Sequence, residues 1–149
     1  MDLCSLRPML ILVALEWQKQ FGVAPQITSA ISEYDAAMML GCSEAEYSRQ
    51  MQSRTAVSKG FDFAYDGFRY QVKANRPSGR RGSKVTLVAK PTNYEWDKLI
   101  WILYDREYLV EEAWLWDCNC FMEQFHEKKR LCPDDMRRGT RLETSSIRN

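Results

Sequence analysis

Residues 61–73 read FDFAYDGFRYQVK, and this stretch decides the fold. Asp66-Gly67 at its centre is typical of a two-residue type I′ turn, which needs a positive φ at both positions. The turn predicts a β-hairpin in which Tyr65 faces Phe68 and every further pair lies one residue farther along both strands. Because side chains alternate between the faces of a strand, one face of this hairpin is apolar and the other mostly polar. The apolar face, which we expect in the core, holds Phe61, Phe63, Tyr65, Phe68, Tyr70 and Val72, and the opposite face holds Asp62, Ala64, Arg69, Gln71 and Lys73.

The polar face places Asp62, Gln71 and Lys73 in one cluster. Opposed side chains of a hairpin lie about 4.5–5.5 Å apart, whereas strand rise puts Asp66 in the turn roughly 13 Å from Asp62. A carboxylate and an amide oxygen are hard ligands that suit Mg²⁺, with Mn²⁺ as a substitute. A lysine beside such an ion can orient or deprotonate a water and offset charge on a phosphoryl transition state. The alternative is that this face only meets water, as the polar faces of most amphipathic hairpins do.

Outward from the hairpin, the apolar pattern predicts helices before it and further strands after it. Leu99–Tyr104 (LIWILY) is a continuous apolar run, which predicts a strand buried on both faces. The predicted elements are helices over 6–21, 25–41 and 44–51, a basic loop over 75–84, strands over 85–88, 99–104 and 108–116, and a helix over 117–130. This order indicates an α/β fold with a mixed or mainly antiparallel sheet. The 149 residues fit one domain, with a core over about 25–130 and a basic tail over 133–149.

At the hairpin the sequence resembles the PD-(D/E)XK nucleases, the restriction-endonuclease-like superfamily, and in particular its small bacterial members. The pattern of that family is an acid at the start of one strand and an acid-x-Lys on the next. Asp62 matches the first acid, and Gln71-Val72-Lys73 matches the second element with glutamine in place of its acid. The resemblance covers about residues 25–117 and extends to an acid on the preceding helix, which Glu33 matches. It implies a restriction-endonuclease-like core, with a central mixed sheet flanked by helices.

The resemblance also implies an activity, the Mg²⁺-dependent hydrolysis of DNA phosphodiester bonds by a deoxyribonuclease. Asp62, Gln71 and Glu33 would hold the metal, and Lys73 would position or activate the attacking water. Glutamine brings one less negative charge than an acid, which leaves a single metal ion or a loss of activity open. On a helical wheel Glu33 lies about 120° from the apolar stripe, beside two alanines that allow a close approach to a sheet. A solvated glutamate on the helix flank is the alternative.

The net charge of +1 hides a strong asymmetry along the chain. From Asp66 to Lys90 seven basic residues stand against one acidic residue, and from Glu95 to Glu123 eight acidic residues stand against two basic ones. Phosphate contacts dominate the affinity of proteins for nucleic acid, so a basic segment that begins at the proposed metal cluster predicts DNA as the partner. The candidate nucleic-acid-binding residues are Arg69, Arg76, Arg80, Arg81 and Lys84. A loop that is merely soluble is the alternative.

Cysteine usage and the apolar runs bear on location. Five cysteines, an odd number in a chain large enough to need no disulfide, favour a reducing cytoplasm. The longest apolar run, Met9–Leu15, is too short to span a bilayer, so we expect a buried helix and no membrane association. We expect neither zinc nor a small-molecule organic cofactor, because no usual zinc-finger spacing is met by Cys118, Cys120, His126 and Cys132.

Two functions other than a nuclease stay open. The first is a catalytically inactive nucleic-acid-binding module on the same fold, with Gln71 marking the decay of the site. The second is a protein-interaction or inhibitor domain that uses the acidic segment 95–123 as its binding face. A nuclease that cuts both strands of a duplex is expected, by resemblance, to be a homodimer. We expect core packing rather than base stacking for Trp96, Trp101, Trp114 and Trp116.

Overall fold

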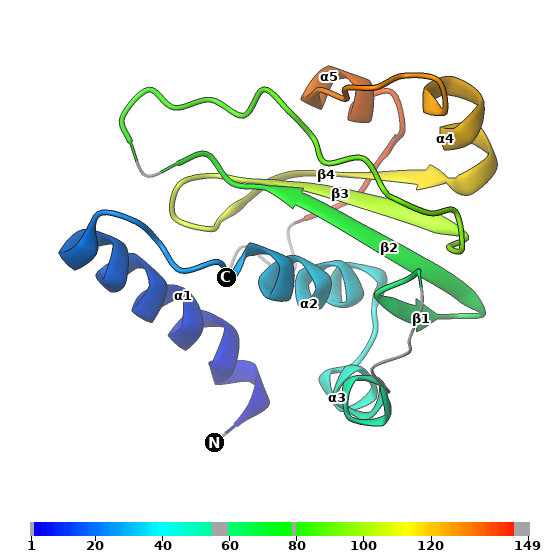
Figure 1. The fold of residues 1–149 in the computed structure, drawn as a ribbon. Helices are drawn as coiled ribbons and strands as arrows, with labels where there is room; N and C mark the ends of the chain where they lie inside the picture. Colours follow the sequence, from blue (N-terminus) through cyan, green and yellow to red (C-terminus); the bar gives the residue numbers. More distant parts are fainter. Residues whose placement is uncertain (1, 55–59, 79, 145–149) are drawn as a thin grey trace.

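A computed structural model describes residues 2–54, 60–78 and 80–144, and these form a mixed α/β structure with a five-stranded sheet (Figure 1). The helices are α1 (Leu3–Phe21), α2 (Thr28–Leu40), α3 (Glu44–Ser53), α4 (Cys118–Phe125) and α5 (Pro133–Met136). The strands are β1 (Phe63–Tyr65), β2 (Phe68–Asn75), β3 (Lys98–Tyr104), β4 (Val110–Asp117) and β5 (Thr140–Arg141). The predicted α/β class with a mixed sheet is therefore confirmed.

The predicted hairpin is formed by β1 and β2 in the expected register. Tyr65 pairs with Phe68 and Phe63 pairs with Tyr70 in an antiparallel ladder. Asp66 and Gly67 between them have φ angles of 51° and 83°, as a type I′ turn requires. The side-chain amide of Gln50 covers the outer edge of β1, because it both accepts from the backbone N–H of Ala64 and donates to its carbonyl. This contact fixes the hairpin against α3.

The sheet has the strand order β1-β2-β3-β4-β5, with β2 and β3 parallel and every other pair antiparallel. The strand β3 lies at its centre, and every residue from Leu99 to Tyr104 is buried, as the apolar run predicts. The crossover from β2 to β3 runs through residues 76–97 and holds no helix among the residues described there. The strand predicted over 85–88 is wrong, because Val88 forms only an isolated bridge with Leu131 outside the sheet.

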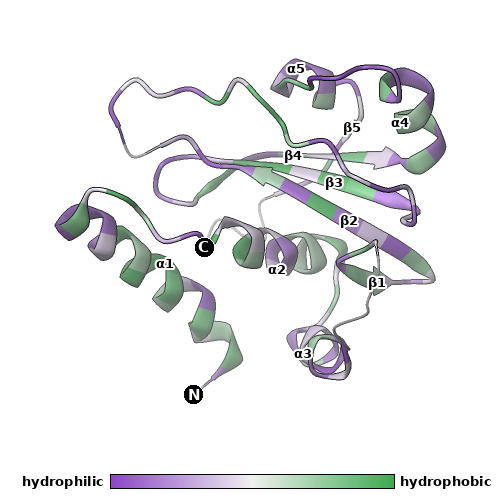
Figure 2. Ribbon diagram, viewed as in Figure 1, coloured by the Kyte–Doolittle hydropathy of each residue, from purple (hydrophilic) through white to green (hydrophobic). Residues whose placement is uncertain are grey.

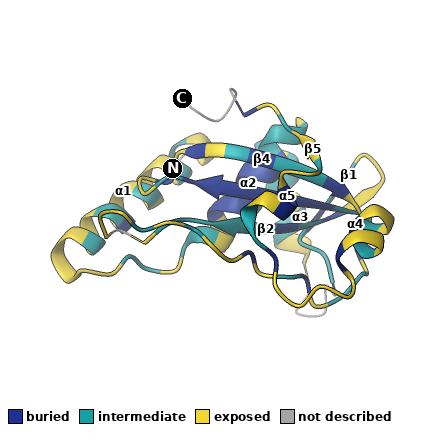
Figure 3. Cartoon of the chain, turned by 90° about the horizontal axis from the view of Figure 1, so that it is seen from above, coloured by how far each residue is buried: buried dark blue, intermediate teal, exposed yellow. Residues whose placement is uncertain are grey.

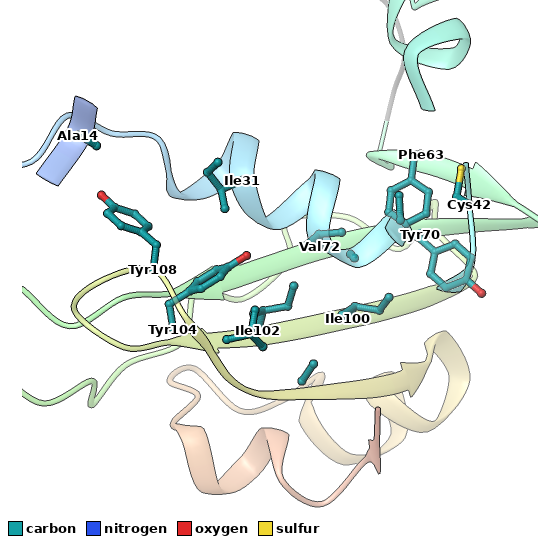
Figure 4. Packing of buried hydrophobic residues seen from close by; sticks show 14 residues of the cluster. Ala14, Ile31, Cys42, Phe63, Tyr70, Val72, Ile100, Ile102, Tyr104 and Tyr108 are labelled. Carbon is teal, nitrogen blue, oxygen red and sulfur yellow. The ribbon is translucent and has the colours of Figure 1, made fainter. Parts of the chain in front are cut away.

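Two apolar cores fill the two faces of the sheet. Helices α1, α2 and α3 cover one face, where Figure 4 shows Ile31 of α2 above Val72, Ile100 and Ile102 of the strands. Helices α4 and α5 cover the other face, where Phe121 and Phe125 meet side chains of β3 and β4. The tryptophans expected in the core are buried or partly buried there, namely Trp96, Trp101, Trp114 and Trp116. The described residues thus form three layers with the sheet in the middle.

Several predicted boundaries differ from the observed ones for local physical reasons. Phe61 packs on the α4 side of the sheet and not with Phe63, because the chain bends at Asp62. The strand predicted from Tyr108 begins at Val110, since Tyr108 has a left-handed φ of 63° in the preceding turn. The helix predicted over 117–130 ends at Phe125, and the unassigned tail contains α5 and β5. Phe68, expected in the core, is exposed beside the hairpin turn.

Helix α1 is the largest departure from prediction. The sequence predicts that the run Met9–Leu15 is buried, yet Ala14 is the one fully buried residue of this helix. Figure 3 shows most of α1 in the colours of exposed and intermediate residues. A charged contact holds α1 to the body, because Arg7 donates to both carboxylate oxygens of Asp35 at 2.5 and 2.8 Å. Asp35 is itself fully buried on α2 and also accepts from the hydroxyl of Tyr104 at 2.6 Å. Among the described residues, no helix is long and apolar enough to cross a bilayer.

Candidate functional site

Asp62 lies at the open edge of β2, immediately before β1 begins. The chain bends there, and its backbone N–H donates to the carbonyl of Tyr70 at 2.8 Å, so the regular ladder does not continue to a pair with Gln71. Its carboxylate instead accepts from the backbone N–H of Val72 at 2.7 Å and from Nε2 of Gln71 at 3.1 Å. The carboxylate thus takes the place of a strand partner on β2. The side chains of Asp62 and Gln71 meet as predicted. They do so through a side-chain hydrogen bond beside the bend, and not as a cross-strand pair of the hairpin.

Glu33 reaches the same carboxylate from α2. Its pKa is raised to about 7 by burial, by the negative charge of Asp62 and by a hydrogen bond between the two carboxyl groups. The positive charges of Arg54 and Lys73 oppose this rise. A raised pKa with these causes means that two acids from separate elements are directed at one partly buried place. The acid predicted on the preceding helix is therefore beside the hairpin acid.

Lys73 lies two residues beyond Gln71 on β2, so both side chains project from the same face of the strand. Lys73 is close enough to Glu33 for its charge to lower the pKa of that acid. Within the described residues, the ammonium group of Lys73 has no hydrogen bond or ion pair. It is therefore a partly buried cation that remains free to meet a ligand.

Two residues of the cluster have no signal in the sequence. Arg54, at the end of α3, donates to the carbonyl of Phe61 at 3.1 Å and lies 3.9 Å from Oδ1 of Asp62. Burial and the charge of Glu33 raise the pKa of Tyr47 to about 12, which places its hydroxyl near the acids. Both come from the segment 44–54, which carries no recognisable motif, so only the tertiary packing of α3 against the hairpin reveals them. A hollow of about 660 Å³ opens beside Arg54 and Asp62, along β1 and α3.

The chemistry of the donors fits one hard cation. Mg²⁺ is held through one or two carboxylates and keeps several waters. Glu33 and Asp62 supply two carboxylates, and the amide oxygen of Gln71 is a neutral oxygen ligand on the same strand. Among the described residues, no three His, Cys, Asp or Glu side chains converge as a metal site, so glutamine and water would complete the set. The mutual destabilisation of two nearby carboxylates is relieved when a cation binds between them.

The basic residues predicted to bind nucleic acid divide into two groups. Arg69 is held by Asp97 through its Nε and Nη2, both at 3.2 Å, and these bonds keep the pKa of Asp97 below its usual range. Arg76 is also engaged, because it donates to the carbonyl of Arg106 and lies over the ring of Tyr108. In contrast, three exposed side chains of the loop have no hydrogen bond or ion pair to the rest of the described chain, namely Arg80, Arg81 and Lys84.

No protein family model matches the chain, and no curated protein shows significant similarity to it.

Proposed function

We propose that this chain is a metal-dependent endonuclease that hydrolyses DNA phosphodiester bonds on a restriction-endonuclease-like core. One observation carries the proposal: Glu33 and Asp62 converge at the open edge of β2 beside Gln71 and Lys73. A structural ion pair would match each acid with a base and lower the pKa of the acid, whereas here the pKa of Glu33 is raised to about 7. The antiparallel hairpin followed by the parallel strand β3 agrees with the core that the motif implies.

Each residue of the cluster has a part in the proposed reaction. Asp62, held in place by the backbone N–H of Val72, and Glu33 would hold Mg²⁺ together with the amide oxygen of Gln71. Such an ion would supply a Lewis acid for the scissile phosphate and would lower the pKa of a water. Lys73 positions the attacking water and offsets the charge that develops on the phosphoryl oxygens. The hollow lined by Arg54 and Asp62 offers a space for the scissile phosphate beside the Asp62 carboxylate.

The exposed loop would hold the substrate. The side chains of Arg80, Arg81 and Lys84 face solvent beyond the end of β2 and have no hydrogen bond or ion pair within the described residues. Such residues bind phosphates without reading sequence, because the phosphate backbone carries the charge and no base identity. Arg69 and Arg76 are less suited to this part, since their guanidinium groups already hold Asp97 and the carbonyl of Arg106.

The decisive experiment is cleavage of supercoiled and linear DNA with Mg²⁺, with Mn²⁺ and with a chelator. We expect metal-dependent cutting by the wild type and a loss of at least about a hundredfold in the variants Asp62→Asn and Lys73→Ala. Asp66→Asn is the matched control for Asp62, because it removes an exposed acid four residues away in the turn. Lys129→Ala, at an exposed site after the end of α4, is the control for Lys73. Full activity of Asp62→Asn or Lys73→Ala would remove the proposal.

A second function is favoured by Gln71 alone. With glutamine at position 71 the site has one negative charge less than it would have with an acid there. The lower charge weakens cation binding. A protein that binds DNA with a steep dependence on salt, yet cuts none with either metal, would be a nucleic-acid-binding module built on the same fold. The same cleavage assay, run beside a binding titration, separates the two functions.

A further inference from the structure

Helix α1 presents an apolar seam that nothing in the described chain covers. Its members are 40–68% exposed and recur with spacings of three and four residues, at Leu3, Leu6, Leu10, Val13, Trp17 and Phe21. Figure 2 shows hydrophobic residues along the whole length of this helix. Alternating spacings of three and four place side chains along one stripe of a helix, the pattern by which two helices pack together. The stripe is therefore suited to pack against a second helix.

A groove runs beside the N-terminal half of the seam. It has a volume of about 390 Å³ between α1, α2 and α3, and its walls include Leu6 and Leu10 of α1, Tyr34 of α2 and Met51 of α3. The groove also holds Glu44, whose Oε2 is buried and has no hydrogen-bond partner within the described residues. The C-terminal half of α1 carries a side chain that suits this groove. The large ring of Trp17 matches the apolar walls, and its indole N–H is a donor for the oxygen of Glu44. The N-terminal end of α1 thus borders the groove, and the C-terminal end carries the side chain that could fill it.

We propose that the α1 seam is the interface of a homodimer in which two α1 helices pack antiparallel about a two-fold axis. The seam is symmetric about its middle, so antiparallel packing sets Leu6 against the partner's Trp17 and Leu10 against the partner's Val13. Trp17 of each copy then enters the groove of the other, where its N–H meets the oxygen of Glu44 that lacks a donor. Such self-complementarity is the requirement of an isologous two-fold contact, and it selects a second copy over an unrelated partner.

The exposed apolar area of the seam is consistent with an interface between two copies of the chain. A large apolar side chain carries on the order of 150–250 Å², so half-exposed side chains along the seam present about 600 Å² of surface, and the groove adds to this. A standard interface buries about 800 Å² on each partner, while a soluble monomer seldom exposes one apolar patch of more than a few hundred Å². Charge does not oppose the contact, because α1 and the residue before it carry two acids and two bases, Asp2, Arg7, Glu16 and Lys19.

The test is the mass of the full chain in solution, by sedimentation equilibrium and light scattering. We expect the wild type to have twice the 17.5 kDa mass of one chain. The variant Val13→Glu introduces a charge that occurs twice in a two-fold interface, so it is expected to weaken the dimer by more than about a hundredfold. Leu12→Glu is the matched control, since Leu12 is 69% exposed yet lies about 145° from the centre of the seam. This variant is expected to remain a dimer.

Each other outcome counts against the interface. A wild type that stays monomeric at high concentration would mean that another kind of molecule covers the seam. Dissociation by Leu12→Glu, persistence of the dimer in Val13→Glu, or open-ended assembly would each contradict the two-fold seam. Circular dichroism confirms that the variants are folded, and Trp17→Glu provides a second seam variant if Val13→Glu is not. Because none of these measurements depends on DNA cleavage, the dimer can fail while the nuclease proposal stands, and the reverse.

Discussion

The substitution Glu33→Gln tests the electrostatics of the candidate site most directly. In the folded protein the pKa of Glu33 is about 7, against a usual value of 4.5. The unfolded chain therefore releases this proton at a lower pH than the folded chain does. The folded state holds the extra proton between these two values, so the contribution of Glu33 to stability falls as pH rises through this window. Above it the loss is complete.

The size of the effect follows from the shift. One pKa unit corresponds to about 1.4 kcal/mol, and partial exposure of the side chain to solvent reduces the realised value, so we expect a loss of about 1–2 kcal/mol. Glutamine has the same shape and no titration. The metal-free Glu33→Gln protein should therefore gain about 1–2 kcal/mol over the wild type at about pH 8 and little at about pH 4.5. Mg²⁺ should reverse the order at high pH, because it stabilises only the protein that keeps both carboxylates.

The assay is urea unfolding followed by tryptophan fluorescence, at several pH values between these limits and with or without Mg²⁺. Glu123→Gln, an exposed acid on α4, is the matched control and should leave the pH dependence unchanged. Parallel pH profiles for the wild type and Glu33→Gln would refute the reasoning, since they would show that the acid of α2 titrates at its ordinary pKa. An equal gain at low and high pH would also contradict it, because only an ionised side chain is destabilised by Asp62.

Three further predictions follow from single contacts. Gln71→Glu adds a carboxylate to the cluster and should tighten Mg²⁺ binding at least about tenfold at pH 8, as measured by calorimetry. Arg7→Ala leaves the buried carboxylate of Asp35 without its cation, so unfolding in urea should show a loss of about 3–5 kcal/mol. Arg81→Ala should reduce the slope of log K against log salt for DNA binding by about 0.9, whereas Arg69→Ala should not change this slope.

Matched substitutions separate these effects from general ones. Gln124→Glu adds the same charge at an exposed site on α4 and should leave Mg²⁺ binding unchanged. Lys19→Ala removes an exposed cation from α1 and should cost less than about 0.5 kcal/mol of stability. An equal loss in Lys19→Ala and Arg7→Ala would mean that the ion pair with Asp35 does not hold the helix.

The parts of the fold that local chemistry determines could be predicted from the sequence. Asp66-Gly67 permits one turn type, and the turn fixes the register of β1 and β2, which the structure confirms. The strand β3 was equally predictable, because six consecutive buried residues from Leu99 to Tyr104 exceed what an exposed or amphipathic element tolerates. Each signal is contained within a few consecutive residues, so it can be read without knowledge of a distant partner.

The parts that depend on distant partners could not be predicted. The bend at Asp62 moves its carboxylate onto the backbone of β2, and no turn signal marks it. The end of α4 depends on a residue distant in the sequence. Lys90 donates to the carbonyls of Phe125, His126 and Lys128, at the C-terminal end of α4 and just after it. The exposure of α1 could not be predicted either, since the run Met9–Leu15 is as apolar as a buried helix and differs only in what packs on it.

The distribution of paired charges bears on which partner the protein meets. Within the described residues, three of the eight acids of the segment 95–123 form ion pairs with bases, because Asp97 holds Arg69, Asp117 lies 3.8 Å from Lys98, and Glu112 holds Arg137. In the loop after β2, the side chains of the exposed arginines and lysine form no ion pair within the described residues. Charges that are already matched gain little from a new partner, whereas unmatched ones release counterions when phosphates replace them. The proposed DNA contact therefore depends on Arg80, Arg81 and Lys84 rather than on Arg69, whose charge Asp97 already matches.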